Sequence, residues 1–403
     1  MIVMLLEGEY PKDIRVRKEA ESLAEAGEPV TVFCYWKTGL LRHEIVNGVQ
    51  VFRVGKNTTF RQLGLRDTFN AIFVFNRLLY KAVLKFAKSN PVKAIHVHDL
   101  HLAKTGFCLR RKLNVPVVLD MHENFPEMLE ERFIFKKTLF KRIKDNLLFK
   151  PSRWKRVEAR LIPKMDYVIA VVEEMKTKLH QLFPNFKDDQ IIVISNYEKN
   201  DFDYSETIPD FEFIPEFTYI TYVGGISPVR GLDTVIEALT ILNKEESNFK
   251  FLIVGSGNDA YLNVLKDLAV KHGQKDNVIF LGQKPFTEIN YYMKKSKINI
   301  IPHIKNDHTD YTIPHKLFQL MQSKTTILVS NCLPLKRVIF DTNSGFVFTA
   351  SSAQSLSDEV LKILALDKEV IDSIQQNAHN SAKQLFSWEK EGLKLVNHYK
   401  NLK

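Results

Sequence analysis

The feature that most constrains this chain is an alternation of short apolar runs with amphipathic stretches, and it occurs twice. In the first half the apolar runs are residues 2–6, 29–35, 49–54, 93–99, 115–123 and 165–175, with helices predicted near 15–26, 67–88 and 100–112. In the second half the runs are 218–225, 249–257, 277–283, 298–303, 325–331 and 344–348, with helices predicted at 231–243, 258–272 and 286–296 and from Pro314 onward. Fully apolar strands separated by helices are typical of parallel sheets covered on both faces. The pattern predicts an α/β fold with two Rossmann-like, doubly wound domains.

The two halves are separated by an acidic, aromatic and proline-containing segment, YEKNDFDYSETIPDFEFIPEF. The 403 residues are enough for two domains of ordinary size. We therefore expect an N-terminal domain at 1–195, a linker at 196–216 and a C-terminal domain at 217–380. The last helix, 381–403, is expected to pack back toward the N-terminal domain.

Two features bear on the compartment. The first apolar run ends at Glu7, which is too short for a signal peptide or a spanning helix. The cysteines, Cys34, Cys108 and Cys332, are odd in number and widely spaced, as in a reducing compartment. The expected location is cytoplasmic.

The net charge of +10 is concentrated in residues 132–160, where eleven Lys or Arg face only Asp145 and Glu158. Apolar residues recur there at helical spacing: Phe135, Leu139, Phe140, Ile143 and Leu147. Such a helix either lies in a membrane interface with anionic lipids or packs in the core with a solvated basic face. The stretch lacks an RNA-binding signature, so no nucleic-acid partner is expected.

Ligands of doubly wound sheets bind at the carboxyl ends of the strands, so the crevice between the domains is the expected site. Gly224, Gly225 and Gly231 bracket one strand-to-helix turn that carries Arg230, which suits either a phosphate site or a tight turn with a surface arginine. Gly255 and Gly257 form a GSG turn without the full GxGxxG spacing. Gly282 and Gln283 either hold a planar base or form an ordinary turn. The helix start at Pro314 points its amides toward an anion.

The order of these motifs resembles a known family. The second half carries YVGGISPVRGL, FLIVGSGN, NVIFLGQ, NIIPH and TIPHKLFQLM. The first half carries EYPKDIRVRKEAESLAEAGEPVTVF, HVHDLHLA, VLDMHENFPEM, DYVIAVVEEMKTKL and VISNYEKNDF, and the chain closes with FSWEKEGLKLVNHY. In order and spacing they are similar to a family 4 glycosyltransferase (glycosyl transferases group 1) of the GT-B fold, over nearly the whole chain.

The resemblance implies roles for particular residues. Catalytic roles fall on His122, near the donor sugar or the reacting face, and on Arg230 and Lys316 at the donor diphosphate. Lys316 is a candidate because Gly225 stands where the family often has a second basic residue. The acceptor side is assigned to Asp13 and Arg15. The implied donor-binding residues are Gly224, Gly225, Arg230, Gly255, Gly257, Gly282, Gln283, Tyr311, Thr312, Ile313, Pro314 and Gln319.

Each of these roles has a structural alternative. His122 fits a satisfied histidine at a strand end. For Asp13 and Arg15 the structural alternative is helix capping and surface charge. The family usually carries two glutamates eight residues apart, where this chain has Tyr311 (next to Asp310) and Gln319. A glutamine offers a ribose one neutral acceptor oxygen where a glutamate offers two charged ones. We therefore expect weaker nucleotide binding, a shifted donor preference or lost activity.

The implied reaction is a retaining, metal-independent transfer from a nucleotide-diphosphate sugar, with UDP or GDP expected, and with no cofactor. The implied acceptor is a glycan, on a polyprenyl-diphosphate lipid, in bacterial surface polysaccharide synthesis at the inner face of the plasma membrane. The only DxD, Asp201 and Asp203, lies in the linker. His96 and His98 should share a strand face while Asp99 points away, which makes a metal site the lesser alternative.

Two other functions are weighed against this one. A GT-B relative that only binds nucleotide sugars or scaffolds a glycan assembly complex is compatible with Gln319 and Gly225. A dinucleotide-dependent oxidoreductase is disfavoured, because the first strand leads into LLEGEYPKD without GxGxxG.

Overall fold

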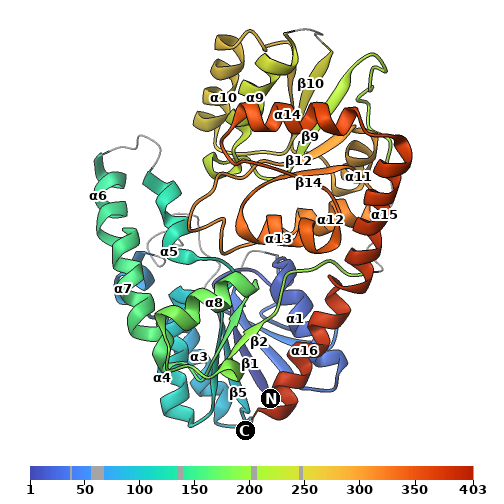
Figure 1. Cartoon of the computed structure of the whole chain (residues 1–403). Coiled ribbons are helices and arrows are strands. Elements are labelled where there is room, and N and C mark those ends of the chain that lie inside the picture. Colours follow the sequence, from blue (N-terminus) through green and yellow to red (C-terminus); the bar gives the residue numbers. More distant parts are fainter. Residues whose placement is uncertain (37–38, 56–67, 134–138, 201–206, 245–247, 403) are drawn as a thin grey trace. The chain divides into compact units, whose positions relative to one another are not determined.

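The structure, a computed structural model, describes residues 1–36, 39–55, 68–133, 139–200, 207–244 and 248–402 (Figure 1). The chain forms two compact units. Unit 1 consists of Met1–Asn196 with Trp388–Lys403, and unit 2 consists of Tyr197–Ser387.

Unit 1 is built on an eight-stranded sheet in the order β3-β4-β2-β1-β5-β6-β7-β8. Only β3 runs antiparallel to its neighbour; the other pairings are parallel. The strands are β1 (Ile2–Leu5), β2 (Val30–Tyr35), β3 (His43–Val46), β4 (Val49–Val54), β5 (Ala94–His98), β6 (Val117–Asp120), β7 (Tyr167–Ala170) and β8 (Ile191–Val193). The helices are α1 (Ile14–Glu25), α3 (Arg77–Ala87), η1 (Leu100–Leu102), α4 (Ala103–Leu113), α5 (Phe125–Met128), η2 (Leu129–Phe133), α6 (Leu139–Leu148), α7 (Pro151–Leu161), η3 (Ile162–Lys164), α8 (Glu173–Leu182), η4 (Asp188–Gln190) and α16 (Trp388–Asn401).

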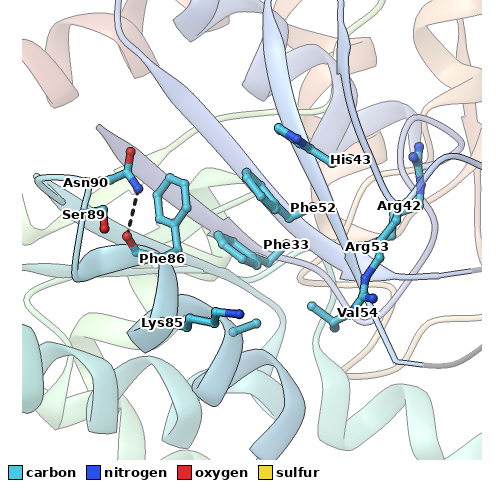
Figure 2. A pocket seen from close by; sticks show the side chains of 11 residues that line it. Phe33, Arg42, His43, Phe52, Arg53, Val54, Lys85, Phe86, Ser89 and Asn90 are labelled. Atoms are coloured by element: carbon cyan, nitrogen blue, oxygen red, sulfur yellow. Dashed lines mark hydrogen bonds between the residues drawn. The ribbon is translucent and has the colours of Figure 1, made fainter.

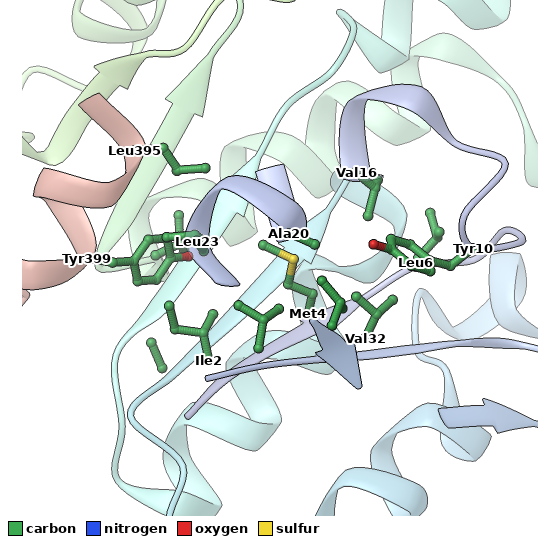
Figure 3. Packing of buried hydrophobic residues seen from close by; sticks show 14 of the residues in the cluster. Ile2, Met4, Leu6, Tyr10, Val16, Ala20, Leu23, Val32, Leu395 and Tyr399 are labelled. Carbon is green, nitrogen blue, oxygen red and sulfur yellow. The ribbon is translucent and has the colours of Figure 1, made fainter. Parts of the chain in front are cut away.

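The core of unit 1 joins the two ends of the chain. Val16, Ala20 and Leu23 of α1 fall on one helix face and are fully buried against β1 and β2. Leu395 and Tyr399 of α16 enter the same cluster (Figure 3). The indole of Trp388 donates to Ser22 Oγ at 2.9 Å. The last helix is therefore an integral part of unit 1.

One predicted helix of unit 1 is wrong as a single element. The stretch expected to be helical over 67–88 consists of a helical segment at 68–73 and the separate α3. Val74 has φ 50°, a left-handed conformation that a β-branched residue adopts only under constraint and that ends a right-handed helix. Asn76 then caps α3 by accepting a hydrogen bond from Leu79 N at 3.0 Å.

Unit 2 is built on a six-stranded, all-parallel sheet in the order β11-β10-β9-β12-β13-β14. The strands are β9 (Thr218–Val223), β10 (Phe249–Val254), β11 (Val278–Gly282), β12 (Ile298–Ile301), β13 (Ile327–Ser330) and β14 (Phe346–Phe348). The helices are η5 (Pro228–Arg230), α9 (Leu232–Leu242), α10 (Asp259–Lys271), α11 (Phe286–Lys295), α12 (Lys316–Gln322), α13 (Leu333–Thr342), α14 (Ala353–Leu364) and α15 (Lys368–Gln384).

The borders of unit 2 differ from the predicted linker and final helix. Phe211 and Phe213, within the expected linker, pack on a buried cluster that includes Tyr219 and Tyr292, so this part of the segment belongs to unit 2. The chain returns to unit 1 at Trp388 rather than at 381. The reason is that α15 buries Ala378 and Ala382 in the unit 2 core beside α12.

Each sheet reverses its strand order at one point. In unit 1 this point lies between β1 and β5, and in unit 2 it lies between β9 and β12. The carboxyl ends of strands at such a reversal are where doubly wound sheets bind ligands. Arg15 follows β1, and Arg230 and Lys316 follow β9 and β12, at these reversals; His122 follows the neighbouring strand β6.

Candidate active site

The glycine-containing loops of unit 2 are packed directly on one another. Gly224 N donates to Val254 O at 2.9 Å, and Gly255 N donates to Gly282 O at 2.8 Å. A Cβ on Gly255 would lie 1.9 Å from Gly224 O, and one on Gly257 would lie 2.2 Å from Ile226 O. Packing alone therefore requires glycine at 255 and 257, and their predicted contact with a donor stays a prediction.

A close approach between β9 and β12 positions Arg230. Gly231 has φ 64°, and a Cβ there would lie 2.0 Å from Pro302 O. This contact holds η5 against the end of β12, where Arg230 Nη1 donates to His303 Nε2 at 3.0 Å. Gly225, by contrast, has open space where a Cβ would be.

Lys316 lies beside the same loop. Its Nζ is 3.7 Å from the centroid of the Tyr222 ring. A Cβ on Gly224 would lie 3.2 Å from the same Nζ. Burial, with the Arg230 guanidinium nearby, lowers the pKa of Lys316 well below its ordinary value. Among the residues that the structure describes, neither Arg230 nor Lys316 has a carboxylate partner.

Two histidines complete this cluster and were not singled out from the sequence. Burial together with Arg230 lowers the pKa of His303 well below its ordinary value and that of His308 to about 4. Both rings are therefore neutral at pH 7, so the fixed positive charge of the cluster is that of Arg230. An anion bound beside Arg230 would favour the protonated form of Lys316, so the two side chains together suit a multiply charged anion.

The predicted helix start at Pro314 is two residues too early. The helix α12 begins at Lys316 and ends at Gln322, with His315 as its N-cap. The Pro314 carbonyl accepts from Leu317 N at 3.0 Å in a tighter turn that precedes the helix. Thr312 Oγ1 donates to His308 O, and Ile313 packs against the unit 2 core, so these two predicted donor contacts have structural roles.

Position 319 has a carboxylate neighbour that sequence analysis missed. Gln319 Nε2 donates to Glu198 Oε2 at 3.2 Å, and His315 Nε2 lies 3.0 Å from the same oxygen. Glu198 is buried. No local signal links positions 198 and 319, because they are 121 residues apart in the sequence.

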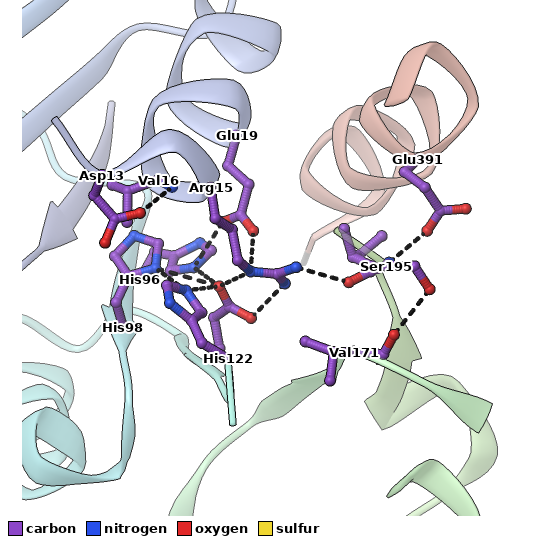
Figure 4. Close-up of polar contacts among 12 residues, drawn as sticks. Asp13, Arg15, Val16, Glu19, His96, His98, His122, Val171, Ser195 and Glu391 are labelled. Atoms are coloured by element: carbon purple, nitrogen blue, oxygen red, sulfur yellow. Dashed lines mark hydrogen bonds and ion pairs between the residues drawn. The ribbon is translucent and has the colours of Figure 1, made fainter. Parts of the chain in front are cut away.

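In unit 1, Asp13 takes the position of its structural alternative, a helix cap, whereas Arg15 differs from both of its expected positions. Asp13 caps α1 by accepting from Val16 N at 3.1 Å. Arg15 is not a surface charge: its side chain is 5% exposed, and Nη2 lies 2.8 Å from Asp120 Oδ1 while Nε lies 3.0 Å from Glu19 Oε1 (Figure 4). Its Nη1 donates to Ile194 O. The proposed acceptor role of Arg15 would have to act through this buried network.

His122 belongs to the same network through Asp120. Its Nε2 lies 2.6 Å from Asp120 Oδ2 and 3.0 Å from His98 Nδ1. Burial opposes the charged ring, but the Asp120 carboxylate prevails and raises the pKa of His122 to about 10. The ring is 14% exposed, and its other nitrogen, Nδ1, lies 4.0 Å from Asp99. A protonated His122 therefore has an Nδ1–H left to donate.

Glu19, His96, His98 and Asp120 are close enough to be considered as metal ligands, with one potential ligand atom from each within 4.8 Å of the others. His96 and His98 do share a face, as predicted, with ring centroids 4.4 Å apart. However, the Arg15 guanidinium contacts both carboxylates. Arg15 and protonated His122 both contact Asp120 and already neutralise it, so the residues fit an ionic network better than a divalent cation. The absence of a metal stays a prediction.

The basic segment forms α6 and α7 over its described part. Ile143 and Leu147 of α6 are 57% and 69% exposed, while Trp154 of α7 is buried. Core packing therefore does not explain these two apolar residues of α6. Phe135 and the DxD at 201–203 lie outside the described residues. Within the described ranges, no helix has both the length and the apolar character needed to cross a membrane.

Two family models match the chain in succession. Glycosyltransferase Family 4 matches residues 14–197, and Glycosyl transferases group 1 matches residues 204–382. An uncharacterized glycosyltransferase of Methanocaldococcus jannaschii, MJ1069, is 25% identical over 256 residues, which are 62% of this chain and 60% of that protein. The match thus spans less than two thirds of this relative's length.

Solved structures share the fold over the whole chain. Sucrose-phosphate synthase from Thermosynechococcus elongatus has a TM-score of 0.76 at 17% identity, covering 100% of this chain and 98% of that one. Anabaena HepE, solved in complex with UDP, has a TM-score of 0.67 at 14% identity, covering 100% of both chains. Together with the two sheets and the two family models, these similarities show that the chain belongs to the glycosyltransferases of the GT-B fold, with a family 4 first half and a group 1 second half.

Proposed function

We propose that this chain transfers a sugar from a nucleotide-diphosphate sugar to a hydroxyl group of a glycan acceptor. The observation that carries the proposal is the pair of basic side chains, Arg230 and Lys316, at the strand reversal of unit 2. Within the described residues neither has a carboxylate partner, so a diphosphate would supply the missing counter-charge. HepE, a protein of the same fold, was solved with UDP, which supports a nucleotide donor.

Arg230 and Lys316 would neutralise the charge that develops on the leaving diphosphate, as preorganised donors do in other transferases. They would do so without a metal ion. For the nucleoside, the Gln319 amide oxygen would accept one ribose hydrogen bond. Glu198, which already accepts from the Gln319 amide, would hold that side chain in place and add an acceptor oxygen nearby.

For the transfer step we propose retention of configuration. The bond between C1 of the sugar and the diphosphate oxygen breaks, and the acceptor oxygen bonds to C1 from the same face. The acceptor proton passes to the leaving phosphate oxygen. His122, held protonated by Asp120, would donate its Nδ1–H to a hydroxyl of the donor sugar.

The proposed acceptor is a glycan on a polyprenyl-diphosphate lipid, used in bacterial surface polysaccharide synthesis. Supporting this are the exposed apolar residues Ile143 and Leu147 in a segment rich in Lys and Arg. Such a helix suits peripheral binding to an anionic membrane from the cytoplasmic side. A second candidate is a protein that binds nucleotide sugars without turnover, which Gln319 and Gly225 favour because they weaken the donor contacts implied by family resemblance.

A thermal-shift panel with UDP, GDP, dTDP and CDP, with and without EDTA, tests the donor site in wild type and Arg230→Ala. The expected result is stabilisation by one or two diphosphates, unaffected by EDTA and lost in the variant. Turnover of the corresponding labelled nucleotide sugar then separates the enzyme from the binding protein. Equal stabilisation of wild type and Arg230→Ala would contradict the assignment of the site.

A further inference from the structure

A pocket of about 490 Å³ lies in unit 1 between α3 and the β3–β4 edge of the sheet (Figure 2). The strands that line it are β3, β4 and β2, and β1 lies between them and the strand reversal; its lining includes none of the residues assigned to the transfer site. Parallel sheets are normally covered on both faces, yet alternate residues of β4 on this face, including Phe52 and Val54, are only partly covered.

The wall of the pocket is a row of rings from three neighbouring strands. Phe33, Phe52 and His43 are register partners across β2, β4 and β3. Phe33 stacks on Phe52 at 5.3 Å and 14°, and His43 stacks on Phe52 at 4.1 Å and 19°. Phe86 of α3 packs edge-on against the two phenylalanines. The row thus gives a flat apolar surface that the helix covers at one end only.

The pocket is positively charged. Its eleven lining residues include Arg42, Arg53, Lys85 and His43 but no Asp or Glu. Arg53 is neutralised from outside the lining by Glu44. Lys85 and Arg42 are exposed and have no ion-pair partner among the described residues; the Arg42 guanidinium lies over the Trp36 ring. An apolar surface next to unpaired cations selects a ligand that is apolar and anionic at once.

We propose that this pocket binds a single amphiphilic anion, a phosphate or diphosphate ester of an apolar alcohol. Its hydrocarbon part would lie on the row of rings, and Lys85 and Arg42 would hold the phosphate. The lipid-linked acceptor proposed above belongs to this chemical class, and only that link depends on the proposed function. Binding itself does not require transfer activity.

Titration calorimetry with farnesyl diphosphate, farnesol and inorganic pyrophosphate tests the proposal on the full chain. All titrations are repeated in Arg230→Ala, so that the anion site of unit 2 does not contribute. Farnesyl diphosphate is expected to bind at least about tenfold more tightly than either farnesol or pyrophosphate. Farnesol lacks the anionic group, and pyrophosphate lacks the hydrocarbon chain.

Two variants with a matched control locate the site. Lys85→Glu is expected to weaken farnesyl diphosphate binding about tenfold or more. Ala82→Phe, which fills the pocket from α3 without removing a core side chain, is expected to abolish it. Lys112→Glu, an equal charge change at an exposed position of α4, should leave farnesyl diphosphate binding unchanged.

Unchanged farnesyl diphosphate binding in an Ala82→Phe protein with wild-type Tm would overturn the proposal. Equal affinities for farnesol and farnesyl diphosphate would overturn the assignment of a phosphate to Lys85 and Arg42. Loss of binding only in Arg230→Ala would mean that the molecule occupies the donor site instead. A functional donor site with no farnesyl diphosphate bound in unit 1 would reject this inference and leave the transfer function standing.

Discussion

Single residues in unit 1 are coupled through shared charge. Asp120 contacts both Arg15 and His122, and its pKa is held well below its usual range by these cations despite burial. Burial and the Asp120 charge raise the pKa of Glu19 to about 8. The protonation of His122 is therefore a property of the network, and Asp120 is the residue that positions and charges it.

This coupling predicts how stability depends on pH. The pKa of His122 is about 10 in the folded protein and near 6.5 when unfolded, so its stabilising contribution is complete below pH 6.5 and is lost as the pH rises through 10. The pKa of Glu19 is raised to about 8 in the folded protein, so its contribution to stability also falls as the pH rises from 4.5 to 8. The free energy of unfolding of wild type relative to Asp120→Asn should therefore fall from pH 6.5 to 10, a difference in which the opposing effect of the lowered Lys316 pKa cancels.

The variant Asp120→Asn should lower the pKa of His122 well below 10, because Asp99 is then the only remaining carboxylate among its named causes that opposes burial. NMR titration of the His122 ring measures this directly. A ring that still titrates near 10 in Asp120→Asn would show that another group charges it.

At the scale of secondary-structure elements, the close contact between the loop after β9 and the end of β12 is what places Arg230. Gly231→Ala would force a Cβ to within 2.0 Å of Pro302 O in a left-handed backbone. We expect a loss of about 3 kcal/mol of unfolding free energy. Gly225→Ala, with open space at the Cβ, is the matched control and should change stability by less than about 0.5 kcal/mol in urea unfolding. Equal losses in both would contradict this packing.

The exposed apolar residues of α6 predict membrane binding by that helix. Ile143→Asp with Leu147→Asp should reduce co-sedimentation with vesicles containing phosphatidylglycerol by about tenfold, because both side chains would otherwise enter the interface. Val264→Asp, on exposed α10, is a matched control with no expected effect. Undiminished binding of the double variant would assign the membrane contact elsewhere.

The regular elements could be predicted because apolar runs and amphipathic spacing are local. Each exception has an identifiable physical cause. Val74 breaks the helix predicted over 67–88 through a left-handed backbone that no sequence pattern announces. The turn at Pro314 and His315 delays α12 until Lys316. Phe211 and Phe213 were read as linker because their packing partners, such as Tyr292, lie far away in sequence.

On the scale of the whole molecule, both units place charged side chains at the reversal of their strand order, as doubly wound sheets do. Family resemblance pointed to His122, Arg230 and Lys316. It could not find Asp120, Glu198 or His303, because their contacts with Arg15, Gln319 and Arg230 join residues from about 70 to 120 positions apart. Charge partners inside a fold are the part of the site that sequence motifs leave out.

The central claim is that Arg230 neutralises the leaving diphosphate in a metal-free transfer. The most direct measurement is kcat/KM for release of the nucleoside diphosphate from its sugar donor, with EDTA present, in wild type and Arg230→Ala. Wild type should turn over in EDTA, and the variant should lose about 10²–10³-fold in kcat/KM. Activity abolished by EDTA, or a variant within about twofold of wild type, would contradict it.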